Sequence, residues 1–252
     1  MKKLFSIYGL LLAGVLAAGA QTRIIAHRGY WKCEGSAQNS ITALQKAAGA
    51  KVYGSEFDVQ LSADGKVIVN HDDNIQGLTI ASTPYSRLKD LTLKNGELLP
   101  TLESYLEEGK KYPDLQLILE IKPHSTKEQE DQIAASVVRT VEAYGMSKQV
   151  EYISFSLNVC EQLVKLAPDS EVSYLNGELS PREIKDKGLT GIDYHTSVYR
   201  KHPEWAAQAK ELGLTTNVWT VNSPKDIREM KALGVDYITT DIPVEANDIV
   251  QE

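Results

Sequence analysis

The chain has 252 residues, of which 42% are hydrophobic, and carries a formal net charge of −7 at pH 7. This length and apolar content suit one large α/β domain or two small ones. The acidic balance argues against nucleic acid as a partner, because a phosphate backbone requires a basic face. It still allows a small phosphorylated substrate that is held by a metal and one or two basic side chains.

The first twenty residues have the features of a secretory signal peptide. Lys2 and Lys3 form a charged start, residues 4–18 are mostly apolar, and Ala18-Gly19-Ala20 is a small-residue cleavage site. The apolar run is too short for a stable membrane span, and no cysteine stands at the cleavage point to carry a lipid anchor. We expect an exported protein, periplasmic or extracellular in a bacterium, with a single domain over residues 21–252 and no stable membrane anchor.

After the signal peptide, short apolar strands alternate with helical stretches. We expect strands at residues 23–26, 53–61, 66–70, 115–121, 150–154, 171–174, 191–194, 215–220 and 237–240. Expected helices span residues 40–48, 102–111, 127–144, 159–166, 181–187, 203–212 and 224–233, and a last one begins at 244. The turn Ser62-Ala63-Asp64-Gly65 joins two of these strands as a hairpin.

About eight strand–helix units without a linker are typical of a (β/α)₈ TIM barrel, an α/β fold. A doubly wound open sheet is the alternative, which is weakened because the sequence contains neither GxGxxG nor a P-loop. Cys33 and Cys160 are the only cysteines in the sequence. We expect two separate thiols, although an oxidising compartment would allow a disulfide. The absence of a CxxC spacing argues against a zinc site.

Two carboxylates on one strand are the most informative feature of the chain. Glu56 and Asp58 are two residues apart, so they project to the same face. At about 4 Å, two like charges repel by about 4 kcal/mol at an effective dielectric near 20. A cation, a shared proton or wide separation in solvent relieves this repulsion. With His71 at the end of the next apolar run, a hydrolytic metal site and a pair of exposed acids on an edge strand are both open readings.

Catalytic groups of a barrel lie at the carboxyl ends of its strands, and many polar residues of this chain fall there. They are His27, Arg28, Glu56, Asp58, His71, Asp72, Glu120, Lys122, Ser154, Ser156, Asp193, His195, Trp219, Asn222 and Asp241. The three acids Glu56, Asp58 and Glu120 would form an oxygen-rich site for a hard cation such as Mg²⁺ or Ca²⁺.

Other groups at this rim suit phosphate chemistry. Two histidines offer an acid and a base near neutral pH, and Arg28 offers a fork for two phosphate oxygens.

Several of these residues have a structural alternative. Glu120 and Lys122 can form a plain buried ion pair. Trp219 can belong to the core or form an apolar wall for the substrate. We expect Asp241 to cap the last helix. The remaining histidines are expected to be structural or at the surface: His124, His195 and His202.

Taken together, these motifs resemble the glycerophosphodiester phosphodiesterases. The matching segments are Ile25-Ala26-His27-Arg28-Gly29, Asn39-Ser40, Glu56-Phe57-Asp58-Val59, Val69-Asn70-His71-Asp72, Leu99-Pro100-Thr101-Leu102, Glu120-Ile121-Lys122, Asn217-Val218-Trp219-Thr220-Val221-Asn222 and Thr239-Thr240-Asp241-Ile242-Pro243. They run from the first strand to the last.

The resemblance implies a metal-dependent phosphodiesterase that releases glycerol 3-phosphate and an alcohol. It assigns the divalent metal to Glu56, Asp58 and Glu120. It makes His27 and His71 the acid–base pair, and it makes Arg28 and Lys122 phosphate contacts. We also expect Trp219 to bind the substrate. Family mechanisms use either water or the glycerol 2-hydroxyl as nucleophile, and both stay open, as do the head group and the oligomeric state.

Two departures from the family pattern stand out. Gln38 replaces the acidic residue that usually precedes the asparagine of the first helix, which removes one negative charge near the expected metal. Residues 30–37 differ from the Pro-rich loop of the family and could select the head group at the mouth. The alternatives are a lipid phosphodiesterase of the phospholipase D or sphingomyelinase D type, with Tyr30, Trp31 and Tyr199 as a membrane-facing rim, or a catalytically silent phosphodiester-binding module.

Overall fold

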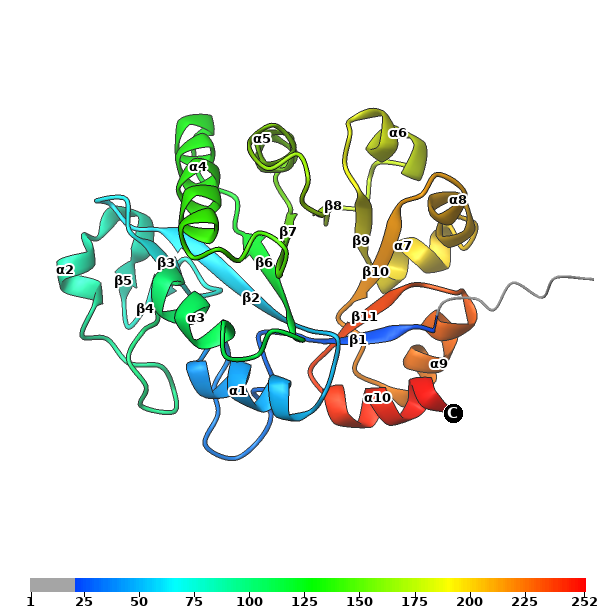
Figure 1. The fold of residues 1–252 in the computed structure, drawn as a ribbon, viewed down its shortest axis with the longest axis horizontal. Coiled ribbons are helices and arrows are strands. Elements are labelled where there is room, and N and C mark those ends of the chain that lie inside the picture. Colours follow the sequence, from blue (N-terminus) through cyan, green and yellow to red (C-terminus); the bar gives the residue numbers. More distant parts are fainter. Residues whose placement is uncertain (1–20) are drawn as a thin grey trace, which may run out of the picture.

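The computed structural model describes residues 21–252, and the expected signal peptide lies outside them. Eight strands in this range form a closed parallel barrel, in which each strand pairs with the next and the last pairs with the first (Figure 1). In order around the barrel they are β1 (Arg23–Ala26), β2 (Gly54–Leu61), β6 (Gln116–Ile121), β7 (Val150–Ser154), β8 (Val172–Tyr174), β9 (Gly191–His195), β10 (Thr215–Trp219) and β11 (Tyr237–Thr240). The expected TIM barrel is confirmed, and the open sheet is not.

Helices surround the strands (Figure 1). They are α1 (Ile41–Gly49), α3 (Leu102–Gly109), α4 (Lys127–Ala143), α5 (Leu157–Leu166), α6 (Pro181–Asp186), α7 (Thr196–Lys201), α8 (Trp205–Glu211), α9 (Pro224–Ala232) and α10 (Pro243–Gln251). Helix α1 shows why they begin where they do: the Ser40 hydroxyl accepts a hydrogen bond from the N–H of Ala43 and satisfies one free donor of the first turn. Its buried residues Ala43, Leu44 and Ala47 then face the strands.

A small lobe follows β2. The expected hairpin is present, because β3 (Val67–Val69) pairs antiparallel with β2. Beyond β3 lie elements that the sequence did not predict: β4 (Asn74–Ile75), β5 (Leu78–Thr79), a 3₁₀ turn (Ile80–Ser82) and α2 (Tyr85–Leu88). They enclose a separate core of Ile68, Ile75, Ile80, Leu88 and Leu99. This core anchors the segment that carries His71 beside the barrel.

Helix α7 was also missed, and it corrects one expectation. Tyr199 lies on α7 and is fully buried, with its hydroxyl donating to the carbonyl of Asn217 at 3.0 Å. It therefore does not belong to a membrane-facing rim. No helix within residues 21–252 is long and apolar enough to cross a bilayer. Across the same range Cys33 and Cys160 are separate thiols, as expected, and Cys160 is buried.

Candidate active site

A cavity of about 120 Å³ opens at the carboxyl ends of the strands. Its lining combines charged and apolar side chains, which are His27, Arg28, Glu56, His71, Glu120, Lys122, Ile153, Phe155, Leu175, Asp193, Trp219, Thr220 and Thr239. Seven of the eight site residues expected from the sequence are in this lining. The eighth, Asp58, is buried in contact with them: its carboxylate lies 3.5 Å from Lys122 Nζ and 3.7 Å from Arg28 Nε.

Three buried carboxylates meet on one side of the cavity. The register of β2 and β6 sets Asp58 beside Glu120, and Glu56 lies one inward position earlier on β2. One oxygen from each lies within 4.8 Å of the others, although the residues are only 1–7% exposed. Glu56 Oε1 and Asp58 Oδ1 accept no hydrogen bond from any residue between 21 and 252. Buried anionic oxygens without donors are costly, so this donor set fits a hard divalent cation.

The electrostatics of this cluster point the same way. Burial, and then the charges of Asp58 and Glu120, raise the pKa of Glu56 well above its usual value. Burial, and then Asp58, raise the pKa of Glu120 to about 7. Burial also opposes ionisation of Asp58, but Lys122, His71 and Arg28 together hold its pKa below the ordinary value. The cluster therefore holds more negative charge than its protein neighbours compensate.

Two residues in an unusual backbone conformation hold the first two carboxylates. Arg28 and Asn39 have φ values of +54° and +62°, in the left-handed region that non-glycine residues rarely adopt. In this conformation the N–H of Arg28 donates to Glu56 Oε2 at 2.7 Å. Asn39 Nδ2 donates to Asp58 Oδ2 at 2.8 Å, and Asn39 Oδ1 accepts from the N–H of Asp58. Local strain of this kind is retained where the surroundings enforce it, and here it fixes two carboxylates.

The basic side chains of the site are held by specific acceptors. Lys122 Nζ lies 2.7 Å from Glu120, so these two residues form the expected ion pair. Glu120 is nevertheless also a member of the acidic cluster. Burial opposes the charge of Lys122, but Glu120 and Asp58 raise its pKa. Arg28 Nη1 donates to Gln38 Oε1 at 2.9 Å. Gln38 therefore acts on the site through Arg28.

His27 is paired with an acid from the far end of the chain. Its Nδ1 lies 2.7 Å from Asp241 Oδ1. Burial opposes ionisation of Asp241, but the bond to His27, with further bonds from Lys32 and Trp31, lowers its pKa. The expectation that Asp241 caps the last helix is wrong, because Ile242 occupies the cap of α10 and makes no side-chain capping bond.

His71 lies on the loop after β3 and is more open. Its Nδ1 lies 2.7 Å from Asp72 Oδ1, and the Asp72 side chain is 79% exposed. Partial burial lowers the pKa of His71, although Asp58 and Asp72 oppose that shift. The two histidines thus have different supports, because His27 is paired with a buried acid and His71 with an exposed one.

Part of the remaining wall of the cavity is apolar. Phe155 meets Trp219 edge to face, with ring centroids 5.3 Å apart. Trp219 Nε1 donates to the carbonyl of Asp193 at 2.9 Å, which fixes the indole. Trp219 therefore packs on a barrel cluster and also faces the cavity. His124 has a structural role instead, because its ring nitrogens are hydrogen-bonded to the backbone of Lys122 and Leu61.

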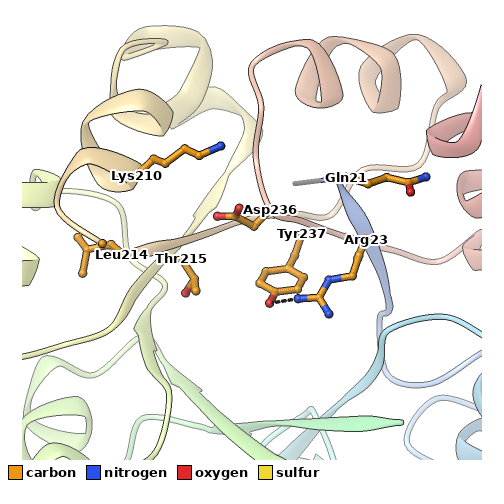
Figure 2. A pocket seen from close by; sticks show the side chains of 8 residues that line it. Gln21, Arg23, Lys210, Leu214, Thr215, Asp236 and Tyr237 are labelled. Atoms are coloured by element: carbon orange, nitrogen blue, oxygen red, sulfur yellow. Dashed lines mark hydrogen bonds between the residues drawn. The ribbon is translucent and has the colours of Figure 1, made fainter. Parts of the chain in front are cut away.

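A second hollow, of about 250 Å³, lies at the opposite end of the barrel, where β1, β10 and β11 begin (Figure 2). Two charged residues of its lining, Arg23 and Asp236, are already engaged. Arg23 donates to the Tyr237 hydroxyl and stacks over the Tyr53 and Tyr237 rings. The carboxylate of Asp236 accepts from the backbone and hydroxyl of Thr216. The described residues that line this hollow include no histidine, and their one acid, Asp236, already accepts hydrogen bonds.

Comparison with known proteins decides the family. The model of the glycerophosphoryl diester phosphodiesterase family matches residues 27–245, which is most of the chain. The chain belongs to this family. Among its relatives, a glycerophosphodiester phosphodiesterase of Caldanaerobacter subterraneus is 26% identical over 249 residues, covering 92% of this chain and 99% of the relative.

Solved structures agree with this phosphodiesterase assignment. A glycerophosphodiester phosphodiesterase from Parabacteroides distasonis is 52% identical, with a TM-score of 0.91, and the match covers 92% of this chain and 98% of that one. A phosphodiesterase from Oleispira antarctica, solved with its product sn-glycerol 3-phosphate, is 22% identical with a TM-score of 0.81 over 92% and 98% of the two chains. This second likeness shows the shared fold.

Proposed function

We propose that this phosphodiesterase hydrolyses glycerophosphodiesters to glycerol 3-phosphate and an alcohol, with a divalent cation held by Glu56, Asp58 and Glu120. The observation that carries the proposal is the group of three buried carboxylates, two of them with an oxygen that accepts no hydrogen bond within residues 21–252, beside a cavity that also contains two histidines. The named relatives and the product complex of the Oleispira antarctica neighbour support the same substrate class.

The carboxylate donors favour a hard cation, Mg²⁺ or Ca²⁺. When bound, such a cation supplies Lewis-acid polarisation of the phosphoryl oxygens. The rest of the chemistry falls to side chains of the chain. Arg28 and Lys122 line the cavity next to the carboxylates. They are the groups that would bind the remaining phosphate oxygens and orient the diester.

The two histidines would move the protons. An ionised Asp241 can only accept a hydrogen bond, so His27 donates from Nδ1 and its Nε2 can exchange a proton with the substrate. In the same way, His71 Nδ1 donates to the carboxylate of Asp72, which leaves Nε2 of His71 free to exchange a proton. One histidine deprotonates the nucleophile and the other protonates the leaving alkoxide. Each such role typically contributes about 10²–10⁴-fold in rate.

The direct test is hydrolysis of glycerophosphocholine by the purified protein with Mg²⁺ or Ca²⁺, followed as release of glycerol 3-phosphate. We expect metal-dependent turnover that falls at least about 10²-fold in His27→Ala and in His71→Ala. A transient cyclic phosphate would identify the glycerol 2-hydroxyl as the nucleophile, and direct release would identify water. Turnover on intact phospholipid alone, or binding without turnover, would instead favour a lipid phosphodiesterase or a silent module.

We also propose that the protein is exported after cleavage behind Ala20, because residues 1–20 combine a basic start, an apolar run and a small-residue site. N-terminal sequencing of the protein recovered from cells tests this. A mature chain that begins at Gln21 supports export, and a chain that keeps Met1 in the cytoplasm contradicts it.

A further inference from the structure

Asp193 is a buried acid that the chemistry above does not use. It lies on β9 and lines the cavity, yet it is only 1% exposed. Its Oδ2 accepts a hydrogen bond from Asn217 Nδ2 at 3.0 Å. Its Oδ1 has no hydrogen-bond partner anywhere in residues 21–252. A buried polar atom without a partner is costly, so a carboxyl retained here indicates a partner that arrives with a ligand.

The surrounding residues hold Asp193 in place. Asn217 Nδ2 also contacts Thr239 Oγ1 at 2.9 Å, and Asn217 Oδ1 accepts from the N–H of Val218. The carbonyl of Asp193 itself accepts from Trp219 Nε1. These bonds fix both the backbone and one carboxyl oxygen, and they leave Oδ1 in a defined position.

Asp193 lies on the other side of the barrel from the carboxylates of β2, next to which the phosphate is proposed to bind. In the order of the eight barrel strands, β9 is four strands from β2 in either direction, so it stands opposite Glu56 and Asp58. The apolar side chains that line the same cavity are Ile153, Phe155, Leu175 and Trp219, and Trp219 contacts the carbonyl of Asp193. A ligand group that fits here has carbon atoms for the apolar wall and one polar group for the carboxyl.

The chemistry of the Asp193 carboxyl indicates which polar group of a ligand it can bind. The phosphate is expected elsewhere, because the basic side chains that would bind it, Arg28 and Lys122, lie against the carboxylates of β2 and β6. Burial, and then Glu120, raise the pKa of Asp193 well above its usual value, which disfavours a cationic head group as partner. A hydroxyl can donate to a carboxylate or accept from a carboxylic acid, so it suits either protonation state.

We propose that Asp193 binds the terminal hydroxyl of the glycerol moiety and makes the enzyme specific for glycerol over a deoxygenated three-carbon group. The inference rests on the proposed function, which places the phosphate beside β2 and β6. With the phosphate there, the glycerol 2-hydroxyl stays near the acidic cluster, and the terminal hydroxyl is the group that extends toward β9. The small cavity of about 120 Å³ suits the glycerol moiety, which is the same in all glycerophosphodiesters. Head groups of different size would extend through the open mouth.

The test compares glycerophosphocholine with propane-1,2-diol 1-phosphocholine, which keeps the 2-hydroxyl and lacks the terminal one. For the unmodified enzyme we expect kcat/KM to be about 10–100-fold lower on the analogue, because a site built around a hydroxyl is left with an unpaired group. Asp193→Leu should lose a similar factor on glycerophosphocholine and almost nothing on the analogue. Asp193→Asn, which keeps shape and hydrogen bonding, should retain most of the preference.

Binding of glycerol 3-phosphate and of propane-1,2-diol 1-phosphate, measured by calorimetry with Mg²⁺, separates this inference from the proposed function. Tighter binding of glycerol 3-phosphate without any turnover would overturn the proposed function and keep the role of Asp193. Equal kcat/KM on the two diesters by the unmodified enzyme, or equal losses on both in Asp193→Leu, would overturn the inference. The comparison with the unmodified enzyme holds even if Asp193→Leu does not fold.

Discussion

His27 and Asp241 are 214 residues apart in the sequence, yet His27 Nδ1 lies 2.7 Å from Asp241 Oδ1. Barrel closure brings them together, because β1 pairs with β11 and Ala26 lies opposite Thr240, one residue before each of them. Asp241 is itself held by Trp31, Lys32 and Asn222. The histidine on the first strand is therefore oriented by an acid on the last, and the loop after β1 reinforces that acid.

Asp241→Asn should lower kcat by about 10²-fold with little change in KM, because the amide no longer fixes His27 in the tautomer that presents Nε2. The matched control is Asp72→Asn, at the exposed acid beside His71, where solvent can replace the lost contact and the loss should be smaller. Steady-state kinetics on glycerophosphocholine measure both. Equal losses in the two variants would show that burial of the supporting acid does not matter.

Glu56→Gln should separate stability from activity. The pKa of Glu56 is raised by burial and by its acidic neighbours, so its charge destabilises the metal-free fold. The amide keeps the shape and the bond from the N–H of Arg28. We expect the metal-free variant to be more stable at pH 8 by about 1 kcal/mol or more, while activity and metal-induced stabilisation are lost. Glu128→Gln, at an exposed position on α4, is the control, and denaturant unfolding with and without Mg²⁺ gives the comparison.

Metal-induced stabilisation should increase with pH. The pKa of Glu120 is raised to about 7, above the value of about 4.3 for a free glutamate. The folded state therefore binds this proton more tightly than the unfolded chain does. The resulting stability is fully present below about pH 4.3 and is lost as the pH rises through about 7. A cation that replaces the proton therefore stabilises the folded state most above that pH.

We therefore expect saturating Mg²⁺ or Ca²⁺ to raise the melting temperature little at pH 5 and clearly more at pH 8. Thermal melts in matched ionic strength measure the two shifts. Glu120→Gln should remove the difference between them. A shift of the same size at both pH values in the unmodified protein would show that the cation does not compete with protons in this cluster.

The sequence predicted the barrel because its strands are short apolar runs separated by capped helices, and these patterns are local. It also placed Glu56 and Asp58 on the same face of their strand, since strand periodicity sets that relation, and closure of the barrel turns that face inward beside Glu120. It failed for Asp241, whose partner depends on barrel closure rather than on neighbouring residues. The adjacency of the first and last strands of a closed barrel was the signal that could have identified this pair.

Other misses have a different cause. Residues 74–88 form strands and helices of two to four residues, too short for any periodicity to appear. The left-handed conformations of Arg28 and Asn39 follow from the contacts that these residues make with the two carboxylates, and no local pattern marks them.

Gln38→Glu tests the main departure of this chain from its family. Gln38 Oε1 accepts from Arg28 Nη1 at 2.9 Å, and Arg28 Nε lies 3.7 Å from Asp58. A glutamate would form an ion pair with Arg28 and draw its charge away from Asp58. The acidic cluster would then be less compensated, so we expect the concentration of Mg²⁺ or Ca²⁺ that gives half-maximal activity to fall about 3–10-fold, corresponding to about 1 kcal/mol for one partly buried charge. Metal titrations of activity and of melting temperature measure this change.

The control is Gln38→Met, which removes the hydrogen bond without adding charge and should not tighten metal binding. Tighter binding in both variants would show that the hydrogen bond to Arg28, and not the charge at position 38, controls metal affinity.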